Sequence, residues 1–344
     1  MAGNGMKGKG QRILSAPLIV NWSLSYLCNF DCRHCYSRSE KSAELDTGQV
    51  LEAGERLARA GILFANFGGG EPLLRRDLGE ITRSLTDSGL SCSMNSNGWL
   101  LDDAAAGMVK DAGFTSVGLS MDSHVAEAHD EFRSRPGSFA RVQEAAERLG
   151  RRHVPLTVST VISRLNYRDL TPIIDLVRTM GAVKLYLHNF KCSGRGFENR
   201  SELDLSPPEW KEFYREALDL AEETGDLEIS FDDPILASLD GGRRDDAAPG
   251  SSCGKMSLHL RPNGDFTPCG FIPLVLGNVL RDDFSEMWKN SPVLEEMRGK
   301  SAKGKCRSCG HYAECLGGCT ARAYAMTGDL NAPDPHCWVD EEVS

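Results

Sequence analysis

The sequence predicts an α/β fold in which six strands alternate with helices and form a partial barrel, followed by a small cysteine-rich C-terminal domain. Short apolar runs alternate with amphipathic segments from about residue 18 to residue 190, and seven of the 12 cysteines lie beyond residue 250. Strands that alternate with helices pair in parallel through right-handed crossovers. Because six such units are too few to close a full barrel, we expect an open one with its chemistry at the carboxyl ends of the strands.

The expected strands are short runs rich in apolar and β-branched residues. They cover residues 18–23, 62–67, 91–95, 115–120, 154–162 and 183–187. The helices carry apolar residues at helical spacing, and several end at a glycine. We expect the first to be capped by Thr47 and to stop at Gly61, and the others to cover residues 77–88, 102–112, 138–149, 167–180 and 207–224. Residues 191–206 are predicted to be a loop, and Asn263-Gly264 predicts a tight turn.

The chain divides into four segments. Residues 1–17 are expected to be flexible, residues 18–240 to form the barrel and its following helix, residues 241–252 to be a linker and residues 253–344 to form the C-terminal domain. Only 27 residues precede Cys28 and seven follow Cys337, so we expect no fused peptide-recognition domain.

Composition narrows the class of protein. With 344 residues and 40% hydrophobic content, the chain is long enough to bury a full-sized core. A net charge of -10 and a pI near 5.4 argue against a general nucleic-acid binder. We see no signal peptide or membrane-spanning run and therefore expect a cytoplasmic protein without membrane contact. In that reducing compartment, clustered cysteines are expected to be metal ligands instead of disulfides.

The first cysteine group, Cys28-x3-Cys32-x2-Cys35, follows the first expected strand. Three thiolates at this spacing can hold three corners of an iron-sulfur cube and leave the fourth iron open to another ligand. A zinc site with a fourth ligand such as His34 is the alternative. The glycine-rich turn Gly68-Gly69-Gly70-Glu71-Pro72 follows the second strand and is expected at the same mouth of the barrel, although an ordinary strand-to-helix turn has the same composition.

Together with Ser96-Asn97-Gly98 after the third strand, these motifs resemble the radical S-adenosylmethionine (SAM) superfamily. The resemblance implies a [4Fe-4S] cluster that binds SAM and yields a 5′-deoxyadenosyl radical after reduction by a flavodoxin- or ferredoxin-type donor. It implies that Ser120 and Arg133 contact the SAM carboxylate, for which a guanidinium is well suited, although each also fits a surface polar residue. The remaining residues that it places around SAM are Gly68, Gly69, Gly70, Glu71, Ser96, Asn97 and Asp122.

The C-terminal cysteines resemble the SPASM domain, which carries two auxiliary iron-sulfur clusters. The resemblance implies an outer cluster held by Cys306, Cys309, Cys315 and Cys337 and an inner cluster held by Cys253, Cys269 and Cys319. Many relatives have a further cysteine shortly after the first, whereas residues 254–268 contain none. The inner cluster is then three-coordinate or takes another ligand, for which His259 is the candidate. Zinc ribbons are the alternative to both clusters.

Several shorter motifs resemble the mycofactocin maturase group, whose chemistry is oxidative decarboxylation of a C-terminal tyrosine of a ribosomal peptide and carbon-carbon cross-linking. They include Ser193-Gly194-Arg195-Gly196, Gly277-Asn278-Val279-Leu280 and Ser308-Cys309-Gly310-His311-Tyr312. The resemblance implies a peptide substrate, presented by a separate recognition protein.

Two other functions stay open. Cys192 lies just beyond the sixth strand, where a thiol can donate a hydrogen atom in a dehydrogenase or epimerase of a small molecule such as an aminocyclitol or sugar. The alternative for Cys192 is a loop cysteine without a role, and Cys92 within the third strand is expected to be a core residue. The second alternative is a non-catalytic iron-sulfur or zinc protein, which would not cleave SAM.

Overall fold

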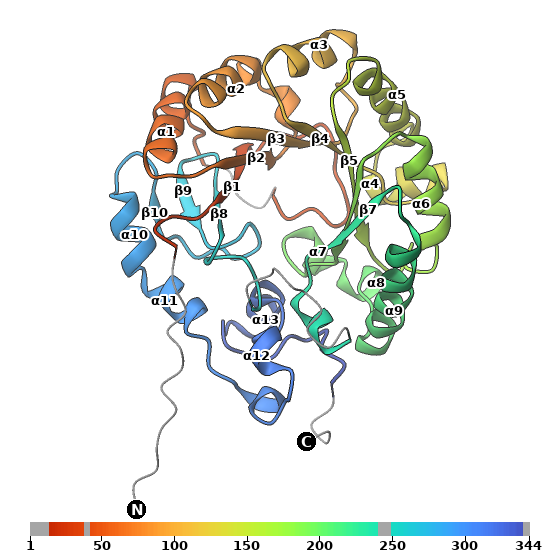
Figure 1. Ribbon diagram of the computed structural model, residues 1–344, viewed down its shortest axis with the longest axis vertical. Helices are drawn as coiled ribbons and strands as arrows, with labels where there is room; N and C mark the ends of the chain where they lie inside the picture. Colours follow the sequence, from red (N-terminus) through yellow and green to blue (C-terminus); the bar gives the residue numbers. More distant parts are fainter. Residues whose placement is uncertain (1–13, 38–41, 240–248, 340–344) are drawn as a thin grey trace, which may run out of the picture.

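The computed structural model describes residues 14–37, 42–239 and 249–339 of the chain. Its centre is a sheet with the strand order β10-β9-β8-β1-β2-β3-β4-β5-β6-β7, curved into an open barrel with helices on its outer face (Figure 1). The predicted α/β architecture is confirmed. Most of the expected flexible N-terminus and of the expected linker lies outside the described residues.

The first seven strands along the chain pair in parallel in chain order, one more than the six predicted. They are β1 (Ile19–Ser25), β2 (Phe64–Gly69), β3 (Ser91–Ser96), β4 (Ser116–Ser120), β5 (Leu156–Ile162), β6 (Lys184–Asn189) and β7 (Glu228–Phe231). The additional strand β7 has four residues and pairs only with β6. A run this short carries too little periodicity to be identified in the sequence.

The larger helices lie where the sequence predicts them. They are α1 (Thr47–Arg59), α2 (Leu78–Asp87), α3 (Asp103–Asp111), α5 (Ser138–Arg151), α6 (Leu170–Thr179) and α9 (Pro207–Glu223). The cap of α1 is Asp46 and not Thr47: the Asp46 carboxylate accepts from the backbone N–H of Gln49, whose side chain accepts from the N–H of Asp46 in return. Before residue 240, three short α-helices were not predicted. They are α4 (Ala126–Arg133), α7 (Arg195–Glu198) and α8 (Arg200–Leu203), and the last two lie in the segment 191–206 that was expected to be a loop.

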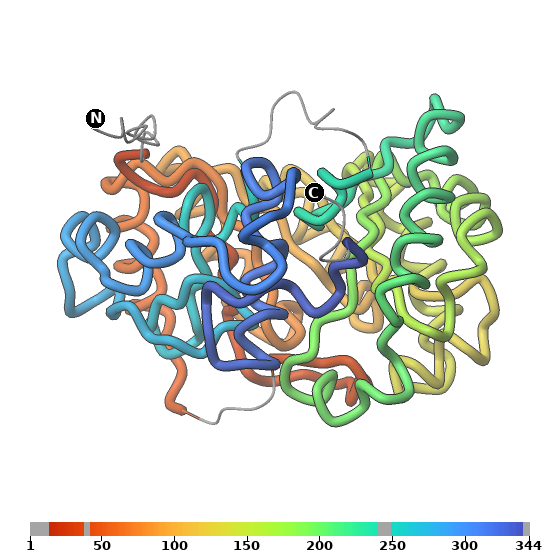
Figure 2. The backbone as a smooth tube through the Cα atoms, turned by 90° about the horizontal axis from the view of Figure 1, so that it is seen from below, coloured from red at the N-terminus to blue at the C-terminus, as the bar shows by residue number. Residues whose placement is uncertain are grey.

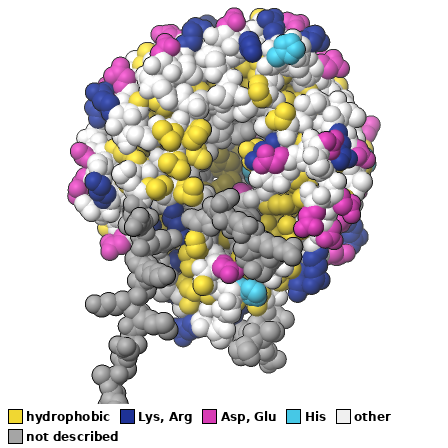
Figure 3. All heavy atoms as spheres, in the orientation of Figure 1, with side chains coloured by type: hydrophobic (Ala, Val, Ile, Leu, Met, Phe, Trp, Pro, Cys, Tyr) yellow, Lys and Arg dark blue, Asp and Glu magenta, His cyan; other side chains and the backbone are white. Residues whose placement is uncertain are grey.

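The two faces of the barrel strands differ in polarity. Core side chains such as Trp22, Phe67 and Leu187 are at most 1% exposed, and burial of each contributes about 1.5–3 kcal/mol. The alternate residues, for example Ser159 in β5 and Tyr186 in β6, are partly exposed on the opposite face. Figure 3 shows a hollow at the centre of the molecule. The barrel interior is therefore lined by polar side chains and is not filled by a second apolar core.

The C-terminal region is joined to the barrel sheet. β8 (Ser257–Leu260) pairs in parallel with β1 and antiparallel with β9 (Asp265–Thr267), which pairs with β10 (Gly277–Asn278). Gly264 has a φ of +85° in the turn between β8 and β9, where the sequence predicts a tight turn. The helices that follow are α10 (Phe284–Asn290), α11 (Pro292–Arg298), α12 (Tyr312–Cys315) and α13 (Thr320–Thr327). α10 and α11 lie beside the β8–β10 end of the sheet, and α12 and α13 lie across the open side of the barrel (Figure 1, Figure 2).

A buried charge network fixes this region to the far edge of the barrel. The guanidinium of Arg322 in α13 is 1% exposed and donates to the carboxylates of Asp233 (2.8 and 2.9 Å) and Asp334 (2.9 Å). Asp233 follows β7 and also accepts from the Tyr214 hydroxyl of α9 (2.8 Å) and from Asn189 of β6. These charges are out of water, so each depends on the others for stabilisation.

In the part of the chain that the structure describes, no helix combines the length and apolar character needed to cross a membrane.

Candidate active site and metal centres

The loop after β1 carries Cys28, Cys32 and Cys35. Burial raises the pKa of the Cys32 thiol to about 11, and the charges of Cys35 and Cys28 act in the same direction. The backbone N–H of Phe30 donates to Cys28 Sγ (3.4 Å). Because the three thiolates repel one another, the site favours either protonated thiols or bound metal cations that offset the repulsion.

The glycine-rich turn at the end of β2 packs against this loop. A Cβ on Gly70 would lie 1.9 Å from the carbonyl oxygen of Leu27, and Gly69, with φ of +95°, would place one 2.6 Å from Ser23 Cβ. At Gly68, in contrast, a Cβ would meet nothing within 4 Å. The turn can therefore pack against the cysteine loop only with glycine at position 70, and against β1 only with glycine at position 69. Gly68 borders open space.

This difference gives a prediction. Gly70→Ala should lower the free energy of unfolding by about 1–3 kcal/mol or more, because the new methyl group collides with a backbone carbonyl that cannot rotate away. It should also lower the iron content, since the displaced backbone belongs to the cysteine loop. Urea unfolding and iron analysis measure the two effects. Gly68→Ala is the matched control and should keep both values; equal behaviour of the two variants would contradict the prediction.

Glu71 connects the ends of two strands to the loop. Its carboxylate is buried and accepts from Ser96 Oγ (2.8 Å) and from the backbone N–H of Asn97 (2.8 Å). Asn97 in turn donates through Nδ2 to Asn29 Oδ1 in the cysteine loop (2.8 Å). Burial raises the pKa of Glu71, while these hydrogen bonds act in the opposite direction. Three of the residues predicted to surround SAM thus form one network that positions the cysteine loop.

The remaining predicted SAM contacts lie at the end of β4 and in α4. Ser120 is the last residue of β4 and is partly exposed. Arg133 donates through Nε to Asp122 Oδ2 (2.6 Å), and its Nη1 lies 4.0 Å from Cys32 Sγ. Burial acts to raise the pKa of Asp122, but the charges of Arg133, His34 and His129 and the hydrogen bond from Arg133 together lower it. Arg133 therefore contacts the carboxylate of Asp122 and the thiol of Cys32 in the cysteine loop.

A second group of thiols contains Cys253, Cys269 and Cys319. A hydrogen bond from Cys269 lowers the pKa of Cys253 to about 7, and the same bond raises the pKa of Cys269. The charge of Cys319 also acts on Cys269, and the Lys191 ammonium acts on Cys253 and Cys319. The three cysteines predicted to hold the inner cluster thus lie near one another and beside one lysine.

Tyr36 lies between the first and the second thiol group. Its ring packs against Phe271 with ring centroids 4.4 Å apart, and a Cβ on Gly270 would lie 3.0 Å from the Tyr36 ring. Burial raises the pKa of Tyr36, and the charges of Cys35 and Cys269 raise it further. Tyr36 was not predicted as a site residue, and its position directly after Cys35 is the signal that the sequence offers for it.

Both ring nitrogens of His259 are engaged in hydrogen bonds. Nε2 lies 2.8 Å from Ser23 Oγ, and Nδ1 lies 3.1 Å from Thr267 Oγ1. The Thr267 hydroxyl donates its proton to the carbonyl of Cys269 (3.0 Å), so it accepts from Nδ1–H, and Ser23 donates to Nε2. A metal ligand needs an available nitrogen lone pair. In this arrangement His259 has no available lone pair, because Nε2 accepts from Ser23 and Nδ1 carries the proton. The arrangement therefore differs from the one expected of a ligand of the inner cluster.

Two buried histidines make the free energy of unfolding depend on pH. Burial lowers the pKa of His259 to about 3 and that of His129 to about 4. In an unfolded chain the pKa is about 6.5, so below that pH the unfolded state binds protons that the folded state does not. The full stability is present above about pH 6.5 and falls by up to about 1.4 kcal/mol per histidine for each pH unit below it.

The urea midpoint should therefore be lower at pH 5.5 than at pH 7.5. His259→Gln should reduce the difference between the two midpoints, because glutamine does not titrate. Equal wild-type midpoints at the two pH values would contradict the expectation.

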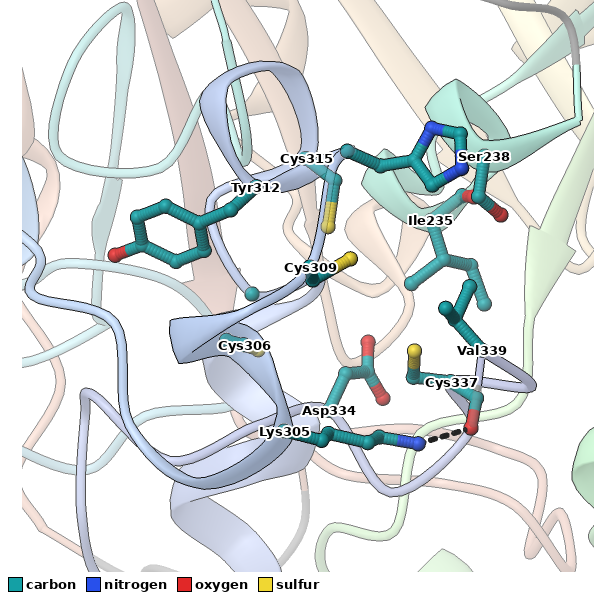
Figure 4. A pocket seen from close by; sticks show the side chains of 12 residues that line it. Ile235, Ser238, Lys305, Cys306, Cys309, Tyr312, Cys315, Asp334, Cys337 and Val339 are labelled. Carbon is teal, nitrogen blue, oxygen red and sulfur yellow. Dashed lines mark hydrogen bonds between the residues drawn. The ribbon is translucent and has the colours of Figure 1, made fainter. Parts of the chain in front are cut away.

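The third group of thiols lines a pocket in the C-terminal region. Its cysteines are Cys306, Cys309, Cys315 and Cys337. Figure 4 shows the thiols of Cys309, Cys315 and Cys337 pointing toward a common space, with Lys305 Nζ donating to the Cys337 carbonyl (2.7 Å). Burial raises the pKa of Cys315 to about 12. The four cysteines predicted to hold the outer cluster thus share one pocket.

Among the described residues, no three histidine, cysteine or carboxylate side chains converge closely enough to bind one metal ion together. The thiolates of a cubane cluster each bind a different iron, so they stand farther apart than the ligands of a single ion.

Cys192 lies in the core and not at an open barrel mouth. It is 4% exposed, and its thiol donates to Asp204 Oδ2 (3.3 Å), which also contacts His336 Nε2 (2.9 Å). Burial raises the pKa of the thiol. A hydrogen donor has to touch the substrate radical, and in this arrangement Cys192 faces Asp204 instead. Cys92 is buried in β3, as expected of a core residue.

Comparison with known protein families identifies both halves of the chain. Residues 22–177 match the radical SAM superfamily, and residues 252–310 match SPASM, an iron-sulfur cluster-binding domain. The AdoMet-dependent heme synthase of Methanosarcina barkeri is 30% identical over 94% of this chain and 97% of the relative. The mycofactocin maturase MftC of Mycobacterium ulcerans is 32% identical over 94% of this chain and 88% of the relative.

The fold also matches a solved structure. Streptococcus suis SuiB bound to S-adenosylmethionine superimposes with a TM-score of 0.79 at 17% identity, covering 95% of this chain and 78% of SuiB. At this identity the match concerns the fold alone. The sequence matches assign the family: the protein belongs to the radical SAM superfamily and is an enzyme with a C-terminal SPASM domain.

Proposed function

We propose that this enzyme modifies a ribosomal peptide, removing a hydrogen atom from it in an oxidative decarboxylation or cross-linking reaction. The observation that carries the proposal is that Tyr36 connects the first thiol group, in the loop after β1, with the second thiol group, in the C-terminal region. The similarity to mycofactocin maturase over most of both chains supports a peptide as the substrate.

The proposal assigns three clusters. A SAM-binding [4Fe-4S] cluster belongs to the loop after β1, and two auxiliary clusters belong to the C-terminal region. The proposed ligands are Cys28, Cys32 and Cys35 for the first, Cys253, Cys269 and Cys319 for the inner, and Cys306, Cys309, Cys315 and Cys337 for the outer cluster. Positive charges beside these thiols, such as Arg133 at Cys32 and Lys191 near Cys319, fit anionic thiolate-ligated clusters.

The side chains around the first cluster have separate roles in this proposal. When bound, the cluster and SAM together supply the 5′-deoxyadenosyl radical. Gly68 leaves space for the cofactor, since no neighbour fills the position of its absent side chain. Glu71 and Asn97 hold the loop in place, and Ser120 presents a hydroxyl at the end of β4. Arg133 holds Asp122 and stabilises the Cys32 thiolate.

A second candidate is synthesis of heme from a porphyrin precursor. It is favoured by length, because the chain covers 97% of the AdoMet-dependent heme synthase and 88% of the maturase. The polar barrel interior is compatible with either substrate. For the peptide reaction we propose two partners, a separate peptide-recognition protein and a one-electron donor of the flavodoxin or ferredoxin type.

Anaerobic turnover distinguishes the two candidates. The reconstituted enzyme, with about 12 iron atoms per chain for three cubane clusters, is mixed with SAM, dithionite and either a peptide that ends in tyrosine or an iron porphyrin with carboxylate side chains. 5′-Deoxyadenosine is measured with the mass of the second product. Peptide-dependent formation of both, with loss of CO2 from the peptide, supports the proposal. Turnover with the porphyrin alone would favour heme synthesis and overturn it.

A further inference from the structure

Lys300 presents a buried, unpartnered ammonium group in the C-terminal region. It lies two residues beyond the end of α11, and its Nζ is buried without a hydrogen-bond partner in the described part of the chain. The backbone around it is fixed, because the Tyr312 hydroxyl donates to the Lys300 carbonyl (3.0 Å) and the N–H of Ser301 donates to Asn331 (3.1 Å). An unpaired buried ammonium is costly, so this position calls for an anion.

The ammonium lies between the two auxiliary thiol groups. The position of a Cβ on Gly317 would be 3.6 Å from Lys300 Nζ and 3.8 Å from Cys306 Sγ, so these two atoms border the same small space. Gly317 has φ of +78°, which disfavours a side chain there. Lys300 also interacts electrostatically with Cys319 of the inner group and Cys315 of the outer group.

The other charged groups near Lys300 do not satisfy its ammonium. Lys305 donates to the Cys337 carbonyl, and Lys255 donates to the carbonyl of Pro249 (2.7 Å). Asp334 interacts with Lys300, but its carboxylate oxygens are hydrogen-bonded to Arg322 and to the backbone N–H of Cys319. The cysteine sulfurs are the remaining anionic groups that face Lys300.

We propose that Lys300 is a counter-charge shared by the two auxiliary clusters and that it raises the reduction potential of the outer one. The proposal rests on the cysteine assignment made under Proposed function. A fixed positive charge in a buried site stabilises the reduced, more negative form of a cluster relative to the oxidised form. Lys300 therefore makes the outer cluster easier to reduce, and because its strongest electrostatic interaction with a cysteine is with Cys319, it acts on the inner cluster as well.

Potentiometric titration followed by EPR tests the proposal without turnover. Lys300→Met and Lys300→Gln, both reconstituted with dithionite as reductant, should show at least a tenfold smaller equilibrium constant for reduction of the outer cluster, a shift of about 59 mV to lower potential. Lys300→Arg keeps the charge and should restore the wild-type potential. Lys303→Met is the matched control: that lysine is 43% exposed and paired with Asp329, so water screens its charge and the equilibrium constant should change less than about twofold.

The possible outcomes are distinct. Equal shifts in Lys300→Met and Lys303→Met, or no shift in either Lys300 variant, would overturn the proposal. Loss of outer-cluster iron in the neutral variants with retention in Lys300→Arg supports a counter-charge that the cluster needs for binding. Loss in all three variants would show a packing role and overturn the proposal. Absence of an outer cluster in the wild-type protein would instead refute the cysteine assignment.

Discussion

Replacing Cys28, Cys32 and Cys35 together by alanine should abolish formation of 5′-deoxyadenosine and remove about four iron atoms per chain. The three cysteines share one loop after β1, and their thiolates repel one another unless protons or metal ions offset the charge. Without them the proposed SAM-binding cluster has no protein ligands, so no radical can be generated. Iron analysis, the visible absorption spectrum and nucleoside release with dithionite measure the loss.

Cys92→Ala is the matched control for this variant. Cys92 is fully buried in β3 and belongs to none of the three thiol groups, so its loss leaves only a small cavity. It should keep the wild-type iron content and nucleoside release. A triple variant that retained SAM cleavage would refute the assignment of the first site.

Replacing Arg322 by methionine should lower the free energy of unfolding by about 3–5 kcal/mol. The change leaves the carboxylates of Asp233 and Asp334 buried side by side without their common counter-charge. Since Asp334 also accepts from the backbone N–H of Cys319 (2.7 Å), its displacement should disturb the inner and outer thiol groups as well. Urea unfolding and iron content are the measurements.

Arg151→Met provides the comparison for that loss. Arg151 is 58% exposed and pairs with Asp103 at 3.2 Å, so its removal should cost less than about 1 kcal/mol. Arg322→Lys keeps the charge but not the two-sided hydrogen bonding, and should recover only part of the stability. Similar unfolding midpoints for Arg322→Met and Arg151→Met would show that the buried network is not required.

The part of the fold governed by local pattern was predictable from the sequence. Six of the seven strands from β1 to β7 and the larger helices follow apolar periodicity and terminal glycines, which act within one element. The cysteine groups were also predictable, because the spacing of Cys28, Cys32 and Cys35 fits three corners of a cubane cluster.

Contacts between distant segments were not predictable in the same way. The sequence indicated neither that β8 pairs with β1 nor that Arg322 lies between Asp233 and Asp334, because each contact depends on how elements far apart in the chain pack. The same applies to His259, whose two hydroxyl partners come from β1 and β9. Cys192 has the chemistry of a hydrogen donor, but only its burial against Asp204 shows which way the thiol points.

The pairing of Ile19 with Ser257 bears on how the chain is made. During synthesis, the earliest strand emerges long before the segment that covers its second edge, and that edge meanwhile offers unpaired N–H and C=O groups to any other extended chain. Contacts this far apart in sequence form slowly. A nascent chain stalled before residue 257 is therefore expected to aggregate or to recruit chaperones, and a fragment that ends at residue 252 should be insoluble when expressed alone.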